Sequence, residues 1–138
     1  MKEWGTYEHP SDQGLTAQAD SFPELLEALG EALTAQLCVA GVVEPRQEQA
    51  MRASADDPGA LVVEFLSELL HRFAIGHFLA ARIEVESVRD NVVTARLWGE
   101  CFDPARHEAG SEVKAVTYHQ LEVGQRDGRW LARVLLDL

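Results

Sequence analysis

The spacing of apolar residues constrains the fold most strongly. In two segments the apolar residues recur with the 3.6-residue period of a helix, and in the other apolar segments they alternate with polar residues, as in strands. The first helix is expected within residues 19–38, where Ser21 precedes Glu24 by three positions, as in a capping box. The second is expected within residues 55–76, because aspartates offer an N-cap and a glycine closes the pattern. The chain therefore combines two helices with several strands.

The predicted strands do not alternate with the helices, which argues against a doubly wound parallel sheet. Four of them follow the second helix directly, with hairpin signals at 89–91 (Arg-Asp-Asn) and 126–128 (Arg-Asp-Gly) and an expected loop at 101–112. We expect an α+β fold in a single domain over residues 1–138, with two helices packed on one face of a largely antiparallel sheet. The predicted strands are 4–7, 15–19, 43–54, 78–88, 91–100, 113–123 and 130–138.

Composition narrows the classes of partner. The net charge is −11 with only 12 Lys and Arg residues, so tight direct binding to a nucleic-acid backbone is not expected. An acidic surface suits a basic protein partner or divalent cations, or serves solubility alone. The chain has no apolar run long enough for a membrane span or a secretory signal, and Cys38 and Cys101 fit neither a zinc spacing nor a disulfide framework. These features predict a cytoplasmic protein.

Motifs for catalysis are weak. A hydrolase-like set could be assembled from Asp103, His107 and Ser111, but the Gly-x-Ser-x-Gly nucleophile elbow is missing from the sequence. The phosphate-binding Walker loop and the dinucleotide glycine spacing are missing as well. His71 and His77 lie in and just after the second predicted helix, where a histidine suits the helix C-terminus. The sequence therefore predicts a protein that is not an enzyme.

The last residues raise a different possibility. The chain stops within an apolar strand pattern, so Asp137 and the terminal carboxylate of Leu138 place two anionic groups within one residue. If the last strand runs beside the first hairpin, Asp12 would add a third carboxylate, and hard cations such as calcium prefer such oxygen ligands. The alternative is that the strand merely ends at the sheet edge with Asp137 in solvent.

Longer stretches resemble one family. Residues 99–123, GECFDPARHEAGSEVKAVTYHQLEV, closely resemble the archease signature Gly-Glu-x-Phe-Asp-x-x-x-His-x-x-x-x-Glu-Val-Lys-Ala-Val-Thr-Tyr-His. Residues 7–15, YEHPSDQGL, resemble the family's Glu-His-Thr-Ala-Asp-Ile-Gly start, and the central FLSELLHRF and the closing ARVLLDL also sit where the family has them. The resemblance spans essentially the whole chain.

The resemblance implies a partner instead of a reaction. Archeases are small protein cofactors of the RtcB-type RNA ligase, which joins tRNA exon halves with GTP and manganese. They promote guanylylation of the ligase and allow it to turn over repeatedly. Their fold combines strand–helix–strand–strand modules. The chain is thus expected to act in tRNA splicing or RNA repair as a non-catalytic activator.

The resemblance also implies a metal site. Its expected ligands are Asp12, Asp137 and the terminal carboxylate of Leu138, with calcium as the cation and magnesium or manganese as alternatives. His9 and His119 would orient these ligands or a bound water. The family's Thr-Ala pair is replaced here by Pro10-Ser11, its apolar residue after the aspartate by Gln13, and its frequent proline by Cys101. The changes beside Asp12 bear on metal affinity, because proline alters the turn and removes an amide donor.

Two other readings stay open from the sequence. The chain could be a stand-alone metal-dependent hydrolase that uses His9 or His119. It could also be an RNA-processing adaptor or chaperone whose metal is purely structural. Turnover by the isolated protein would favour the first of these readings. Activation of the ligase that survives chelation, once the fold is maintained, would favour the second.

Overall fold

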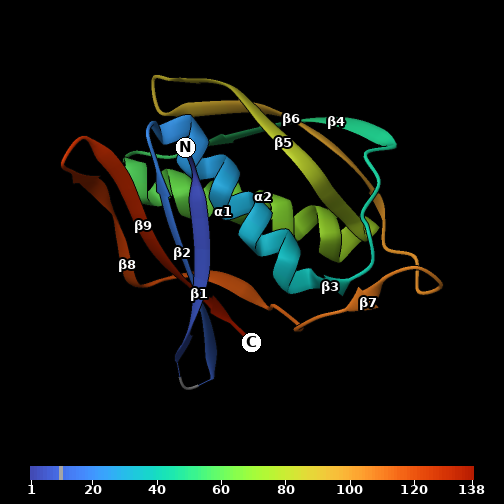
Figure 1. The fold of residues 1–138 in the computed structure, drawn as a ribbon. Helices are drawn as coiled ribbons and strands as arrows, with labels where there is room; N and C mark the ends of the chain where they lie inside the picture. The colour runs from blue at the N-terminus through green and yellow to red at the C-terminus, as the bar shows by residue number, and fades with distance from the viewer. Residues whose placement is uncertain (10) are drawn as a thin grey trace.

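The computed structural model describes residues 1–9 and 11–138, and within them two helices and nine strands (Figure 1). The helices are α1 (Phe22–Leu37) and α2 (Pro58–Gly76). The strands are β1 (Glu3–His9), β2 (Asp12–Ala19), β3 (Cys38–Ala40), β4 (Gln47–Ser54), β5 (Phe78–Arg89), β6 (Val92–Cys101), β7 (Glu108–Ala109), β8 (Ala115–Arg126) and β9 (Arg129–Asp137).

The strands form two main sheets, and the helices lie between them. One sheet has the order β1-β2-β9-β8, the other β4-β6-β5, and β3 pairs with β7 in a small third sheet. These pairings are all antiparallel. Helix α1 contacts β2 and β5, and α2 contacts β8, β4 and β5, so each helix touches both sheets (Figure 1). The predicted α+β class is confirmed, although we expected one sheet covered on one face.

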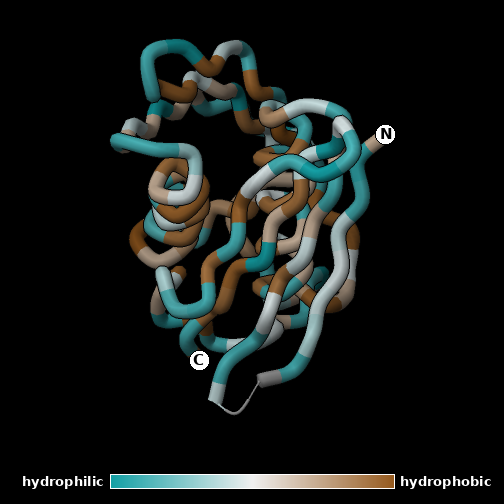
Figure 2. Tube along the Cα trace, turned by 90° about the vertical axis from the view of Figure 1, so that its left-hand side faces the viewer, coloured by the Kyte–Doolittle hydropathy of each residue, from teal (hydrophilic) through white to brown (hydrophobic). Residues whose placement is uncertain are grey.

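The helices need this double cover because their apolar arcs are wide. Helix α1 buries Leu25, Leu26, Ala28 and Leu29 within little more than one turn, so more than one of its sides is apolar. A single sheet would leave part of that arc in water. Figure 2 shows apolar positions concentrated along the helices and the adjoining strands, with hydrophilic positions along the turns. The core therefore lies between the two sheets.

Capping side chains set the helix boundaries. The Ser21 hydroxyl accepts the Glu24 N–H at 3.3 Å, which confirms the Ser21 cap, and it donates to the Glu24 carboxylate at 3.1 Å in place of the backbone N–H that a full capping box uses. Asp57 caps α2, since its carboxylate accepts the Ala60 N–H at 2.8 Å. His77 ends α2 in the left-handed region with φ 58°, and its N–H donates to the Phe73 carbonyl at 2.8 Å. His77 therefore serves as a helix cap.

The two predicted hairpin turns are confirmed. Asp90 and Asn91 have φ values of 53° and 60°, and Asp127 and Gly128 have 54° and 78°. Positive φ at both central residues is the hairpin geometry that Asp, Asn and Gly favour. The loop expected at 101–112 is interrupted, because β7 lies within it and pairs with β3. Strands of two and three residues are too short to show an alternating pattern.

Backbone packing leaves no room for a side chain at Gly99, the first residue of the signature segment. A Cβ on Gly99 would lie 1.8 Å from the carbonyl oxygen of Leu79 on the neighbouring strand β5. The register of β5 against β6 is irregular between Ala80 and Arg82, beside this close approach. The glycine that opens the signature is thus required by backbone packing.

A candidate metal site at the end of the four-stranded sheet

Strand pairing brings the two predicted aspartates together. Asp12 on β2 is the direct cross-strand partner of Asp137 on β9, and Ala115 on β8 is opposite Asp137 on the other side. Side chains of directly opposed residues share one face of the sheet, with Cβ atoms about 4.5–5.5 Å apart. Leu138 follows Asp137, and the C-terminus lies near the β1–β2 hairpin (Figure 1). The condition that the last strand runs beside the first hairpin is confirmed.

Both aspartates belong to the sheet face that points away from the helices. Leu15 on β2 and Val134 and Leu136 on β9 are fully buried in the core. Asp12 and Asp137 occupy the opposite parity of their strands and therefore project from the outer face. Asp137 is exposed and Asp12 half-buried. The carboxylates are thus accessible from solvent while their backbones are held in the sheet.

An aromatic platform lies beside them on the same face. The next residue row joins Tyr7, Gly14 and Leu135 across three strands. The Tyr7 ring covers Gly14 so closely that a Cβ there would lie 2.2 Å from it, and the Arg133 guanidinium stacks 4.4 Å from the ring centre. Leu135 is fully buried although it lies on the face away from the helices. This packing fixes the strands that carry Asp12 and Asp137.

The proposed orienting residues are placed only in part. The backbone of His9 pairs with that of Asp12 across the hairpin, and its side chain and Pro10 lie outside the described part of the structure. His119 is exposed on β8, and its N–H donates to the Thr117 hydroxyl at 3.3 Å. The roles of His9 and His119 stay predictions.

The donor chemistry fits a hard cation with few protein ligands. Among the side chains that the structure describes, no group of three or more from His, Cys, Asp and Glu is placed to hold a metal ion. The predicted set instead combines two aspartate side chains with a main-chain carboxylate. Such an all-oxygen set suits calcium, magnesium or manganese, each of which also binds waters.

One acidic residue of the signature segment, Glu100, is buried in an ion-pair network. The side chain of Glu100 is only 6% exposed and pairs with Arg106 through both of its oxygens. The backbone N–H of Glu44 donates to it at 2.7 Å. Hydrogen bonds from Arg106 and then from Glu44 lower the pKa of Glu100 to about 2. Glu100 therefore stays ionised and joins the segment after β3 to the segment after β6.

The structure gives two of the candidate hydrolase residues, Asp103 and His107, a structural role. His107 is fully buried: its Nδ1 accepts the Asp103 N–H at 2.9 Å, so Nε2 carries the proton and donates to the Val42 carbonyl at 3.0 Å. The Asp103 carboxylate accepts the Ala105 N–H and pairs with Arg106, and these contacts lower its pKa. Both His107 nitrogens are thus engaged, which leaves no general base in this set.

The role of Glu100 was missed by reasoning from residue patterns. A single glutamate at the end of a strand pattern carries no periodic signal, and its partner Arg106 lies in an irregular turn. Only the family signature marked the segment. The ion pair fixes the turn that contains Arg106 against β6. Further along the chain, the Lys114 N–H donates to the Asp137 carbonyl at 2.8 Å.

None of the helices in the described part of the chain is long and apolar enough to cross a membrane.

Comparisons with known proteins agree on one family. The model of the Archease protein family (MTH1598/TM1083) matches residues 4–138. The protein archease of Pyrococcus abyssi is 33% identical over 142 residues, covering 100% of both chains. That of Methanopyrus kandleri is 34% identical over 138 residues, covering 98% of this chain and 99% of its own.

Two solved structures share the fold. The solution structure of Methanobacterium thermoautotrophicum protein 1598 has a TM-score of 0.80 at 26% identity, covering 98% of each chain. The crystal structure of an archease from Thermotoga maritima has a TM-score of 0.69 at 18% identity, covering 96% of this chain and 94% of that one. The second likeness supports the fold alone. With a family match over nearly the whole sequence and relatives of equal length, the chain belongs to the archease family.

Proposed function

We propose that the protein activates an RtcB-type RNA ligase by presenting a divalent cation held by Asp12, Asp137 and the terminal carboxylate of Leu138. Calcium is the proposed cation, with magnesium or manganese as alternatives. The observation that carries the proposal is the direct pairing of Asp12 with Asp137 on an accessible sheet face. Membership of the archease family supports the choice of the ligase as partner, which the sequence resemblance implies.

The electrostatics of the pair support a ligand. Like charges directly opposite each other on neighbouring strands destabilise a sheet. The terminal carboxylate adds a third negative charge in a protein whose net charge is already −11. A cation bound among these groups would relieve the repulsion, and the acidic surface would steer the protein toward a basic partner.

The residues of this chain have defined tasks in this proposal. The aspartates and the terminal carboxylate bind the cation, and the Tyr7 platform keeps their strands in register. When bound, the cation would supply positive charge for phosphate oxygens at the ligase active site. His9 would orient the Asp12 turn, as groups around metal ligands commonly do. The protein itself carries out no covalent step.

Multiple-turnover ligation tests the proposal. The RtcB-type ligase from the same organism is assayed with this protein at substoichiometric amounts, beside Asp137→Asn and the control Asp90→Asn. Asp90 lies in the β5–β6 turn, where asparagine also accepts a positive φ. We expect a large gain in turnover with the wild type and the control, and none with Asp137→Asn. Full activation by Asp137→Asn would refute the mechanism.

The same proteins and the same ligation assay distinguish this proposal from one rival function. The Thermotoga archease is described as a possible chaperone, a role in which the cation could be only structural. In that case chelation would lower the melting temperature of the protein, and activation would persist at a temperature where the chelated protein stays folded. Our proposal predicts that chelation abolishes activation even when the protein is fully folded.

A further inference from the structure

Strand β8 contains an unusually large irregularity. Thr117 pairs with Leu135 on β9, whereas Glu122 pairs with Arg133. Four residues of β8, 118–121, therefore stand opposite one residue of β9. An ordinary bulge inserts one residue, and this segment, called here the β8 bulge (residues 118–121), inserts three. The extra length must project from the edge of the sheet, since β8 is its last strand.

The β8 bulge is held at both ends. The Thr117 hydroxyl donates to the Leu135 carbonyl at 3.2 Å and accepts the His119 N–H at 3.3 Å. At the other end, Leu121 is half-buried and its Cδ2 lies 3.3 Å from the position of a Cβ on Gly59, at the start of α2. The bulge is thus a fixed projection from the sheet.

The backbone conformation of the β8 bulge and the exposure of its aromatic ring both cost free energy of folding. Gln120 adopts φ 52°, in the left-handed region that non-glycine residues rarely enter. Tyr118 leaves 57% of its surface exposed, as one of the few large apolar residues on the surface. A bulge that only blocks edge pairing could be built from polar residues. A strained backbone that displays an aromatic ring is more typical of a functional surface.

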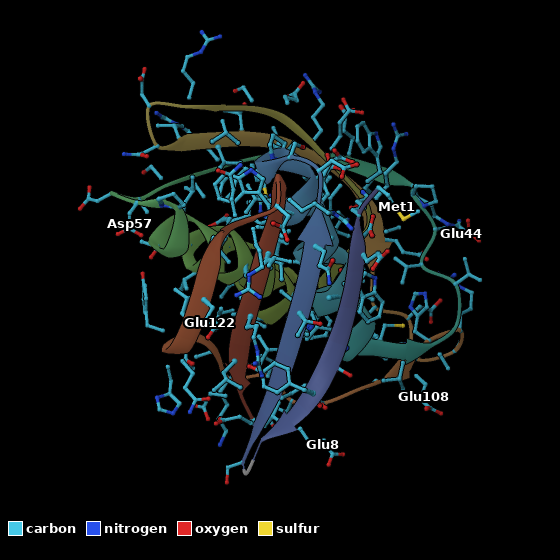
Figure 3. All side chains as sticks on the ribbon, turned by 60° about the vertical axis from the view of Figure 1, so that its left-hand side comes forward. Met1, Glu8, Glu44, Asp57, Glu108 and Glu122 are labelled. Carbon is cyan, nitrogen blue, oxygen red and sulfur yellow. The ribbon has the colours of Figure 1, made fainter. Side chains whose placement is uncertain are left out.

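The bulge lies beside the candidate metal site. Thr117 is two positions from Ala115, the direct partner of Asp137, which places the start of the bulge about 7 Å along the strand. The surroundings carry charges of both signs: Glu122, labelled in Figure 3, follows the bulge and stands opposite Arg133 on β9, and Asp137 lies opposite Ala115. A partner that approaches the metal site from this edge of the sheet would therefore meet the aromatic ring together with Glu122 and Asp137.

We propose that Tyr118 anchors a basic protein surface, that of the RNA ligase, beside the metal site. The identity of the ligase as partner rests on the proposed function. Arg and Lys side chains of the partner would stack on the Tyr118 ring and pair with Glu122, and the net charge of −11 would favour the approach of a basic surface. A ligase that binds RNA presents such basic surface. An RNA strand is a poorer occupant, because the protein carries a net charge of −11.

The test compares Tyr118→Ala and Tyr118→Phe with Ile75→Ala. Ile75 is a matched control because it is 73% exposed at the far end of α2. Biolayer interferometry measures the affinity of each protein for immobilised ligase, and ligation assays measure the concentration that gives half-maximal activation. Melting temperature and calcium affinity are measured on the isolated proteins.

We expect Tyr118→Ala to raise both the Kd for the ligase and the half-activating concentration at least tenfold. Tyr118→Phe and Ile75→Ala should stay within twofold of the wild type. Melting temperature and calcium affinity should be unchanged in all three variants. This combination would separate docking from metal binding and from stability.

Other outcomes overturn the proposal. An unchanged Kd in Tyr118→Ala refutes the anchor, and a parallel fall in melting temperature or calcium affinity assigns Tyr118 a structural role. Weaker binding to an RNA oligonucleotide with unchanged ligase binding would make RNA the occupant. If the wild type binds the ligase without activating it, the proposed function fails and the Kd of Tyr118→Ala still decides the anchor. If it does neither, both proposals fail.

Discussion

Replacing Asp137 by asparagine should have opposite effects on stability with and without a divalent cation. Asp137 stands directly opposite Asp12, so the two carboxylates repel each other when no cation is bound. Two unit charges about 5 Å apart in water repel by about 0.8 kcal/mol, and cross-strand pairs are worth about 0.2–1 kcal/mol. In chelator, Asp137→Asn should therefore raise the melting temperature by about 1–4 °C for a domain of this size.

A saturating concentration of the cation should make the wild type more stable than Asp137→Asn, the reverse of the order expected in chelator. A ligand at 100 times its dissociation constant stabilises the folded state by about 2.7 kcal/mol. The wild type should gain this stabilisation, whereas Asp137→Asn loses one ligand and gains much less. The wild type should then be the more stable protein by about 2 kcal/mol. Thermal melts of both proteins in chelator and in millimolar calcium give the four values required.

The control for charge alone is Asp90→Asn, at an exposed turn of the other sheet. It should show no reversal, because its carboxylate is remote from the site. If Asp137→Asn is destabilised equally in chelator and in calcium, the carboxylate has a structural role and the reasoning is wrong. If calcium stabilises both proteins equally, the cation binds elsewhere.

Three further predictions concern the frame of the site. Arg106 holds the pKa of Glu100 at about 2, below its ordinary 4.5. The ionised carboxylate therefore contributes fully to the free energy of unfolding above pH 4.5, and this contribution is lost as the pH falls toward 2. Glu100→Gln should weaken the pH dependence of the free energy of unfolding, measured by urea titration. Gly14→Ala would push the Tyr7 ring aside and should cost about 1–2 kcal/mol in denaturant unfolding, and an unchanged midpoint would contradict the packing. Gly99→Ala meets a backbone carbonyl at 1.8 Å and should cost about 3 kcal/mol or more, measured by thermal melting.

Local patterns predicted the features that depend on neighbouring residues. The Ser21 cap, the two left-handed hairpin turns and the start of α2 follow from side chains that bond to their own backbone segment. The proximity of Asp12 and Asp137 was predicted only on the condition that the last strand runs beside the first hairpin. It depends on pairing across more than 120 positions of the chain, which no local period encodes.

The features that were missed depend on long-range packing. The pair β3–β7 is too short to alternate, and the division into two sheets follows from apolar arcs on the helices that must be covered on several sides. Residues 113–123 were expected to form one regular strand, but the β8 bulge arises because Leu121 packs near α2 while Thr117 stays bonded to β9. The ion pair of Glu100 likewise joins separate loops.

Calcium titration of the wild type and of a chain extended by one glycine after Leu138 tests the central claim most directly. The extension converts the Leu138 carboxylate into an amide and moves the terminal charge by about 3.4 Å, while Asp12 and Asp137 are unchanged. The account predicts one calcium site in the wild type, at least a tenfold loss of affinity in the extended chain, and equal melting temperatures in chelator. Equal calcium affinity in both chains would contradict the claim that the terminal carboxylate is a ligand.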